Sequence, residues 1–127
     1  MVRPLHNIEC RDAIIAFDTD ERPYPAEWPE AEFIVGNPPF LGDRRMRAAL
    51  GNTYVDQIRG TYKGRVPPGA DFVCFWHERA REQVEAGQSR RAGLLATNSI
   101  RGGLNRRVLD RVKGSGDIFL AWSDQPW

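Results

Sequence analysis

The stretch Phe33-Ile34-Val35-Gly36-Asn37-Pro38-Pro39-Phe40 decides how the rest of the chain is interpreted. It begins with an apolar, β-branched run that stops at a glycine, which is typical of a short strand covered on both faces, as in a parallel sheet. Two successive prolines follow, and each of them fixes φ and lacks a backbone N–H. The sequence therefore predicts a buried strand that ends in a rigid, extended turn.

A turn of this kind could hold a planar amine. The prolines direct the Asn37 amide oxygen and the Pro38 carbonyl one way, and neither proline has an N–H to compete. Two convergent acceptors can hold the amine hydrogens while the nitrogen lone pair faces an electrophile. Phe40 offers a ring face on which a base could stack, and the carboxyl ends of parallel strands are where ligands sit. The alternative interpretation is a Pro-Pro turn with an asparagine cap.

The remaining pattern alternates between strands and helices. We expect strands over 8–10, 93–97 and 118–122, and either a helical turn or a strand over 13–17. Helices are expected over 43–50, around Tyr54 and Ile58, from a cap at Asp71 to Gly87, and over 104–112. This order predicts an α/β fold with a mainly parallel sheet.

Composition excludes several classes of protein. The chain has 127 residues, which suits one domain, and with 41% hydrophobic and 28% charged residues it is neither disordered nor membrane-like. No secretion signal is seen at the first residues. Cys10 and Cys74 lack the spacing of a zinc site, so we expect two buried thiols, no metal and a cytoplasmic location.

The charge is unevenly distributed. Residues 1–42 carry 3 basic and 8 acidic side chains, whereas residues 43–65 carry 6 basic and 2 acidic ones. A local basic cluster is what contact with phosphate requires, although a solvated surface loop is the simpler interpretation. The candidate DNA-binding residues are Arg44, Arg45, Arg47, Lys63 and Arg65, with Arg59 in the same segment.

Asn37-Pro38-Pro39-Phe40 resembles the catalytic tetrapeptide of class I amino-methyltransferases. The stretch over 7–13 resembles the segment in which these enzymes place an acidic residue against the adenine of the cofactor. The stretches over 31–42, 92–100 and 118–127 resemble, in that order, parts of the DNA methyltransferases of type IIG restriction-modification systems. The resemblance implies a partial Rossmann-like domain that uses S-adenosyl-L-methionine to methylate the exocyclic amine of adenine in double-stranded DNA. It assigns catalysis to Asn37, Pro38, Pro39 and Phe40, with the target base flipped out of the duplex.

The same resemblance gives Asp12 the role of accepting a hydrogen bond from the adenine of the cofactor. From the residues alone, an aspartate that caps a helix over 13–17 is an equally good interpretation. Asn98, Ser99 and Arg101 follow the strand predicted over 93–97 and present a similar choice. They either line the pocket of the target base or form a polar loop that caps the next helix.

A complete enzyme of this class needs a glycine-rich loop after its first strand, and no such unit precedes Asp12. We therefore expect a single partial catalytic domain over 1–127, truncated at both ends, with a basic insert over 43–70. Its partners would be DNA and the missing parts of the same enzyme, with no membrane. The chain alone is expected to be inactive.

Other functions remain open at this stage. A methyltransferase that acts on protein glutamine or on an RNA amine would use the same turn, although the basic insert favours a polyanion. A non-catalytic remnant belongs to a different class, and it would show no cofactor binding. A hydrolase built on Ser99, His77 and an aspartate would lack the glycine pattern of a nucleophile elbow around the serine.

Overall fold

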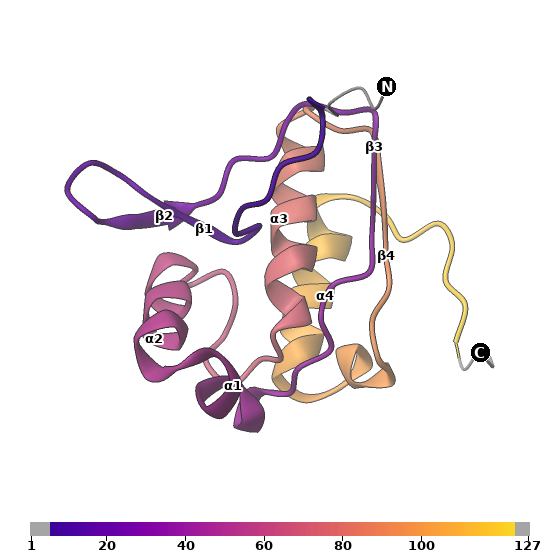
Figure 1. Ribbon diagram of the computed structural model, residues 1–127. Coiled ribbons are helices and arrows are strands. Elements are labelled where there is room, and N and C mark those ends of the chain that lie inside the picture. Colours follow the sequence, from indigo (N-terminus) through magenta and orange to yellow (C-terminus); the bar gives the residue numbers. More distant parts are fainter. Residues whose placement is uncertain (1–5, 124–127) are drawn as a thin grey trace, which may run out of the picture.

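The computed structural model describes residues 6–123, which form two small sheets and a group of helices (Figure 1). The strands β1 and β2 form an antiparallel hairpin that projects from one side of the molecule. The strands β3 and β4 form a separate parallel pair. In chain order the elements are β1 (Ile15–Phe17), β2 (Pro23–Pro25), β3 (Phe33–Gly36), α1 (Asp43–Leu50), α2 (Asn52–Thr61), α3 (Val73–Glu85), β4 (Arg91–Leu94), the 3-10 helix η1 (Asn98–Arg101) and α4 (Gly103–Ser115).

The parallel pairing of β3 with β4 confirms the predicted α/β class. Phe33 pairs with Arg91 and Gly36 with Leu94, so the two strands end at the same edge of the sheet. The helices α1, α2 and α3 form the crossover between them, as a parallel connection requires. The antiparallel pair β1–β2 was not predicted. It resolves the ambiguity over 13–17 in favour of a strand.

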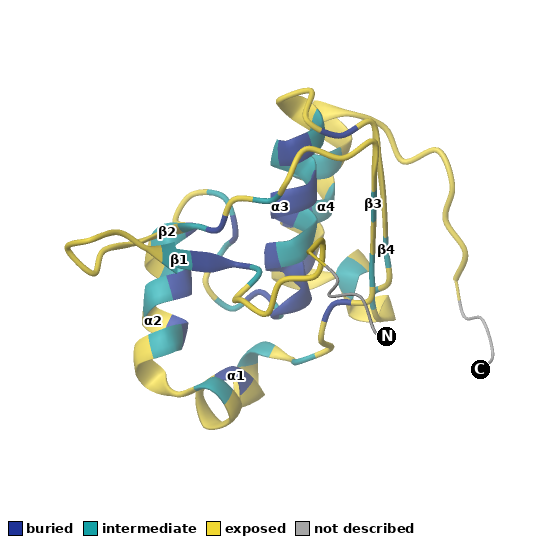
Figure 2. Ribbon diagram, turned by 45° about the horizontal axis from the view of Figure 1, so that its top comes forward, coloured by how far each residue is buried: buried dark blue, intermediate teal, exposed yellow. Residues whose placement is uncertain are grey.

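The core lies around α3 rather than on the sheet. Figure 2 shows burial concentrated along α3 and β1, whereas β3 and β4 are only partly buried. Tyr62 and Phe75 are fully buried or nearly so, and their rings meet edge to face at 5.3 Å. The Tyr62 hydroxyl donates to the carbonyl of Ile14, with 2.7 Å between the oxygens, which ties β1 to the end of α2. The largest fully buried side chains also include Met46, Ile58 and Val108.

A buried carboxylate joins three parts of this core. Glu78 on α3 has no exposed surface and accepts hydrogen bonds from Arg65, Arg81 and Arg111. Burial acts to raise the pKa of Glu78, but hydrogen bonds from the three arginines outweigh it and hold the pKa below its usual value. The segment before α3, α3 itself and α4 are thereby linked by one charge.

The prediction that the strand β3 is covered on both faces is wrong for the described residues. Val35 is 86% exposed and Phe33 56% exposed, because α3 and α4 lie against only one side of the β3–β4 pair (Figure 1). The outward side carries Phe33 and Val35, which alternate with the half-buried Ile34.

Three further expectations are corrected. The segments over 8–10 and 118–122 contain no strand, because neither pairs with another segment in the described chain. Cys10 is exposed, whereas Cys74 is buried as predicted. The Asp71 side chain makes no capping bond to α3, since it accepts from the backbone of Asp43 at the start of α1 instead. Within residues 6–123, no helix has the length and apolar character needed to cross a membrane.

Candidate active site

The Asn-Pro-Pro-Phe turn (Asn37–Phe40) leaves β3 at its carboxyl end and is held on both sides. Before it, the Leu95 amide donates to the carbonyl of Gly36, with 3.1 Å between nitrogen and oxygen. After it, the Phe72 amide donates to the carbonyl of Leu41 at 2.9 Å. The turn is therefore anchored to β4 upstream and to the start of α3 downstream, and its two prolines stiffen what lies between.

A pocket of about 310 Å³ opens beside this turn. Two tryptophans stand in its walls, and both rings have defined orientations. The Trp28 indole nitrogen donates to the carbonyl of Ala13 at 2.8 Å, and Trp76 meets Phe72 edge to face at 4.7 Å. The full lining is Trp28, Ile34, Val35, Gly36, Asn37, Pro38, Pro39, Trp76 and Leu94.

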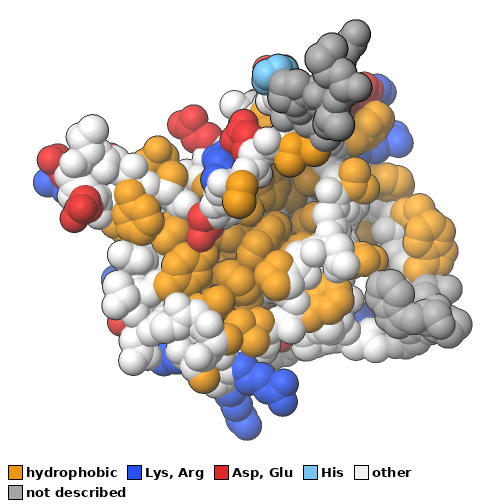
Figure 3. All heavy atoms as spheres, in the orientation of Figure 1, with side chains coloured by type: hydrophobic (Ala, Val, Ile, Leu, Met, Phe, Trp, Pro, Cys, Tyr) orange, Lys and Arg blue, Asp and Glu red, His pale blue; other side chains and the backbone are white. Residues whose placement is uncertain are grey.

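The lining is mostly apolar, with the Asn37 side chain as its one polar side chain besides the indole nitrogens. Figure 3 shows hydrophobic side chains gathered in a hollow between the β1–β2 hairpin, α2 and β3. An apolar pocket with flat aromatic walls and one amide suits a planar ring that carries a hydrogen-bonding edge. Phe40 follows the pocket residues in the chain and is 46% exposed, so its ring is accessible.

Asp12 lies close in the structure to one wall of this pocket, since its neighbour Ala13 accepts the hydrogen bond from Trp28. Its Oδ1 accepts from the amides of Ile14 and Ile15, at 2.7 and 3.0 Å. Its Oδ2 accepts from the Tyr54 hydroxyl at 2.8 Å. Asp12 therefore caps the start of a strand, not of a helix, and its exposed Oδ2 retains a lone pair for another donor.

The polar residues after β4 reach the same edge of the sheet as the Asn-Pro-Pro-Phe turn. Asn98, Ser99 and Arg101 lie on η1, and none of them lines the pocket. The Ser99 hydroxyl donates to Asp71 Oδ2 at 2.9 Å, and Arg101 donates to Asn98 at 2.9 Å. Two interpretations of these residues followed from the sequence, a pocket wall or a helix cap. Neither of them included the hydrogen bond from Ser99 to Asp71.

The basic insert is helical, with α1 and α2 occupying most of it, and three of its six basic side chains form ion pairs within the described chain. Arg59 pairs with Asp43, and Arg47 pairs with Asp56 at 2.8 Å. Arg65 reaches Glu78 at 3.0 Å and also contacts Glu82. Within residues 6–123, no ion pair holds the side chains of Arg44, Arg45 or Lys63.

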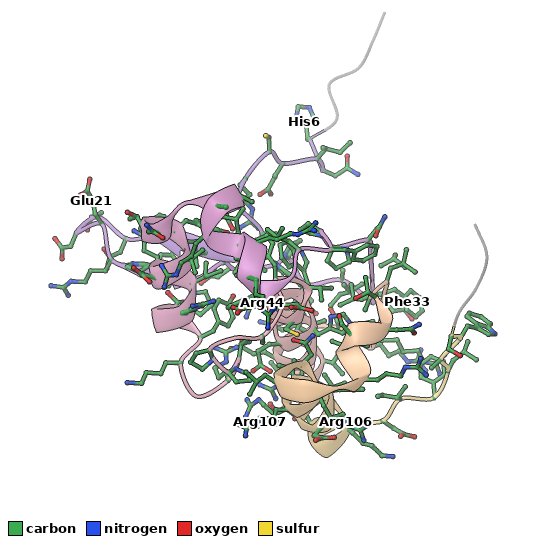
Figure 4. All side chains as sticks on the ribbon, turned by 90° about the horizontal axis from the view of Figure 1, so that it is seen from below. His6, Glu21, Phe33, Arg44, Arg106 and Arg107 are labelled. Carbon is green, nitrogen blue, oxygen red and sulfur yellow. The ribbon has the colours of Figure 1, made fainter. Side chains whose placement is uncertain are left out.

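Figure 1 shows α1 and the start of α4 at the end of the molecule where β3 and β4 terminate. Figure 4, seen from that end, labels Arg44 on α1 and Arg106 and Arg107 on α4. Arg106 pairs with Asp110 at 2.8 Å, whereas no described acidic residue pairs with Arg107. Arg107 is not among the DNA-binding residues predicted from the sequence, because it is far from the basic insert along the chain. One sequence signal did point to Arg107, since it lies in the helix that follows the loop after the strand β4.

Comparison with known families gives one match. The family model described as MmeI, DNA-methyltransferase domain, matches residues 4–127. Neither the curated proteins nor the solved structures that were compared include a match to the chain.

Proposed function

The chain belongs to the family of the MmeI DNA-methyltransferase domain, and we propose that it is part of a catalytic domain that methylates the exocyclic amine of adenine in double-stranded DNA. S-adenosyl-L-methionine is the methyl donor in this proposal. The observation that carries it is the rigid Asn-Pro-Pro-Phe turn at the carboxyl end of a parallel strand, beside an apolar pocket walled by Trp28 and Trp76.

In the proposed reaction, the turn holds the target amine. Asn37 Oδ1 and the Pro38 carbonyl accept its two hydrogens, which leaves the nitrogen lone pair directed away from the turn. As the nitrogen forms its bond to the methyl carbon, the bond from that carbon to the sulfonium sulfur would break, and the sulfur would leave as a neutral thioether. The nitrogen becomes positively charged in this step, so these two acceptors interact most strongly in the transition state. The proton that the amine loses passes from these acceptors to solvent.

Phe40 is proposed to stack on the flipped adenine. Its ring is 46% exposed and follows directly after the turn, so a base held by Asn37 would come within its reach. Stacking of a base on an aromatic side chain contributes about 1–3 kcal/mol. The rigid turn fixes the distance between the amine acceptors and this stacking surface.

The residues around the pocket fit the proposed cofactor. When bound, S-adenosyl-L-methionine supplies an electrophilic methyl group on a positively charged sulfur. The remaining lone pair on Asp12 Oδ2 would accept from the adenine amine of the cofactor, and the aromatic walls would hold its flat ring. Asp12 is already oriented by three hydrogen bonds, so it needs no reorganisation to accept another.

Fewer residues are proposed to contact DNA than the sequence predicted. Arg44, Arg45 and Lys63 are exposed and without ion pairs within the described chain, so they are the best candidates for phosphate contacts. Arg47 is exposed but paired with Asp56. Arg65 is half-buried between two glutamates, and we assign it to the core rather than to DNA.

The proposal also includes further parts of the same enzyme. A parallel sheet is ordinarily covered on both faces, yet Phe33 and Val35 expose apolar side chains on the outward side of β3. We propose that this pair of strands is part of a larger Rossmann-like sheet, in the cytoplasm, and that residues 1–127 do not methylate DNA alone.

Product identity tests the proposal. The domain completed by its remaining parts is incubated with labelled S-adenosyl-L-methionine, a duplex and a glutamine peptide. We expect N6-methyladenine, because the turn is proposed to hold an exocyclic amine and the arginines without ion pairs favour DNA over a peptide. The choice of adenine over cytosine comes from the resemblance to type IIG enzymes. Label on cytosine or glutamine would contradict the substrate, and no label in any product would contradict the enzyme.

A further inference from the structure

The two loops that leave the carboxyl ends of β3 and β4 meet on one carboxylate, that of Asp71. Asp71 lies just before α3 and does not line the pocket. Its Oδ1 accepts a hydrogen bond from the backbone amide of Asp43 at 2.9 Å. Asp43 lies three residues after Phe40, where the loop that follows β3 ends and α1 begins. Its Oδ2 accepts from the Ser99 hydroxyl at 2.9 Å, in the loop that follows β4. A single side chain thus connects the loops on both strands.

Asn105 on α4 orients this carboxylate. Its Nδ2 donates to Asp71 Oδ2 at 2.8 Å and also to the carbonyl of Ser99 at 3.1 Å. Its Oδ1 accepts from the Asp71 backbone amide at 2.8 Å. Asn105 is 7% exposed, so these bonds are shielded from water. The pair Asp71–Asn105 therefore ties α4 and η1 to the segment that follows the Asn-Pro-Pro-Phe turn.

The charge state of Asp71 suits this role. Partial burial acts to raise its pKa, but hydrogen bonds from the Asp43 amide, Asn105 and Ser99 outweigh burial and leave the pKa below its usual value. Within the described residues no basic side chain pairs with Asp71. Its negative charge is therefore balanced by hydrogen-bond donors alone, and bonds to an ionised acceptor are shorter and stronger than neutral ones.

We propose that Asp71, held by Asn105, is a positioning residue for methyl transfer. It fixes the downstream end of the Asn-Pro-Pro-Phe turn relative to the Ser99 loop, while the Leu95–Gly36 bond fixes the upstream end. Asn37 and Pro38 then keep their acceptors at the spacing that the amine requires. This inference rests on the proposed function, because it concerns the geometry of that same turn.

The test uses Asp71→Ala and Asp71→Asn, with Asp110→Asn as the matched control. Asp110 is exposed on α4, and its one ion pair among residues 6–123 is with Arg106, so the control makes the same chemical change away from the turn. Ser99→Ala removes the hydrogen bonds of this exposed hydroxyl to Asp71 and to Thr97, and it serves if the Asp71 variants do not fold. The first readout is hydrogen exchange of the Asp43 and Phe72 amides in residues 1–127, measured by NMR.

The second readout is steady-state methylation by the completed domain. Misplacing a reacting group by about 1 Å can cost on the order of a hundredfold in rate. We expect kcat to fall about tenfold to a hundredfold in Asp71→Ala and less in Asp71→Asn, which keeps an acceptor for the Asp43 amide. The KM for S-adenosyl-L-methionine should change by no more than about twofold, since Asp71 does not line the pocket.

The outcomes separate the two proposals. Faster exchange at Asp43 and Phe72 together with a loss confined to kcat supports the positioning role. Unchanged exchange, or faster exchange with normal kcat per folded molecule, overturns it and leaves Asp71 a structural link. If the wild-type domain transfers no methyl group, the proposed function fails, whereas the exchange data still decide whether Asp71 holds the turn.

Discussion

The Tyr54 hydroxyl donates a hydrogen bond to the Asp12 carboxylate, with 2.8 Å between Oη and Oδ2. This bond joins α2, in the basic insert, to the residue that we assign to the cofactor. Burial is the largest cause of a raised Tyr54 pKa, and the hydrogen bond to Asp12 adds to it. The phenol therefore stays protonated and keeps donating throughout the physiological pH range.

Tyr54→Phe should lower the free energy of unfolding of residues 1–127 by about 0.5–1.5 kcal/mol, the usual net contribution of one hydrogen bond. Urea denaturation measures the loss. Tyr24→Phe is the matched control, because Tyr24 is 41% exposed on β2. Equal effects of the two substitutions would contradict a stabilising role for the Tyr54–Asp12 bond.

Asp12→Ala should weaken binding of S-adenosyl-L-methionine to the completed domain by about 1–3 kcal/mol, because the cofactor amine would lose its acceptor. Calorimetry gives the dissociation constant directly. Asp20→Ala, at the exposed tip of the β1–β2 hairpin, is the control and should bind normally. An unchanged constant in Asp12→Ala would restrict Asp12 to capping β1.

Neutralising Arg44, Arg45 and Lys63 together should weaken binding to all duplexes and flatten its salt dependence. Each lost phosphate contact lowers the slope of log K against log salt by about 0.9. Fluorescence anisotropy at several salt concentrations measures this slope. Arg90→Ala is the control, because Arg90 precedes β4 at the opposite end of the strand. An unchanged slope would leave the insert without a DNA role, and loss on one sequence only would indicate base reading.

The buried Glu78 predicts a pH dependence of stability. A carboxylate with a lowered folded pKa stabilises the fold above its unfolded pKa, about 4.3 for glutamate, and this contribution is lost as pH falls toward the lower folded value. Glu78→Gln should lower the free energy of unfolding at pH 7 by about 1.5–3 kcal/mol, because the three arginines lose a charged acceptor. Arg65 and Arg81 keep their ion pairs with Glu82 and Glu85, so neither is left without a partner.

The difference in the free energy of unfolding between wild type and Glu78→Gln should become smaller below about pH 4.3. Denaturation at pH 7 and pH 3 measures it, with Glu30→Gln as an exposed control. If the free energies of unfolding of the two proteins differ by the same amount at both pH values, the charge of Glu78 does not stabilise the fold.

The sequence predicted those features that local residues determine. The strand over 33–36 and the turn after it follow from an apolar run, a glycine and two prolines, and α3 follows from the helical spacing of its apolar residues. Pairing of β3 with β4 was predictable because alternating strands and helices favour parallel neighbours.

Features that depend on distant residues could not be predicted in this way. The segment over 118–122 is apolar, but a strand also needs a pairing partner. Asp71 was interpreted as a cap because its local position suits one, whereas its real donors are 28 to 34 residues away in sequence. Arg65 counted as a DNA candidate by charge alone, since only the fold brings Glu78 to it.

Phe40→Ala should reduce methylation less than loss of Asn37, because it removes stacking rather than an acceptor for the amine. A flipped base stacked on one ring contributes about 1–3 kcal/mol. Binding of a duplex with a mismatched target adenine should weaken by a similar amount, since such a base is already partly extruded. Normal binding of that duplex by Phe40→Ala would remove Phe40 from the target site.

Single-turnover methylation of an adenine-containing duplex by wild type and Asn37→Ala tests the assignment of the turn most directly. The control is Gln88→Ala, which removes another amide side chain from the connector between α3 and β4, away from the turn. We predict a rate about 10²–10³ lower in Asn37→Ala, as for loss of one preorganised group in a transition state, with cofactor binding retained. A near-normal rate in Asn37→Ala would contradict the catalytic role of the Asn-Pro-Pro-Phe turn.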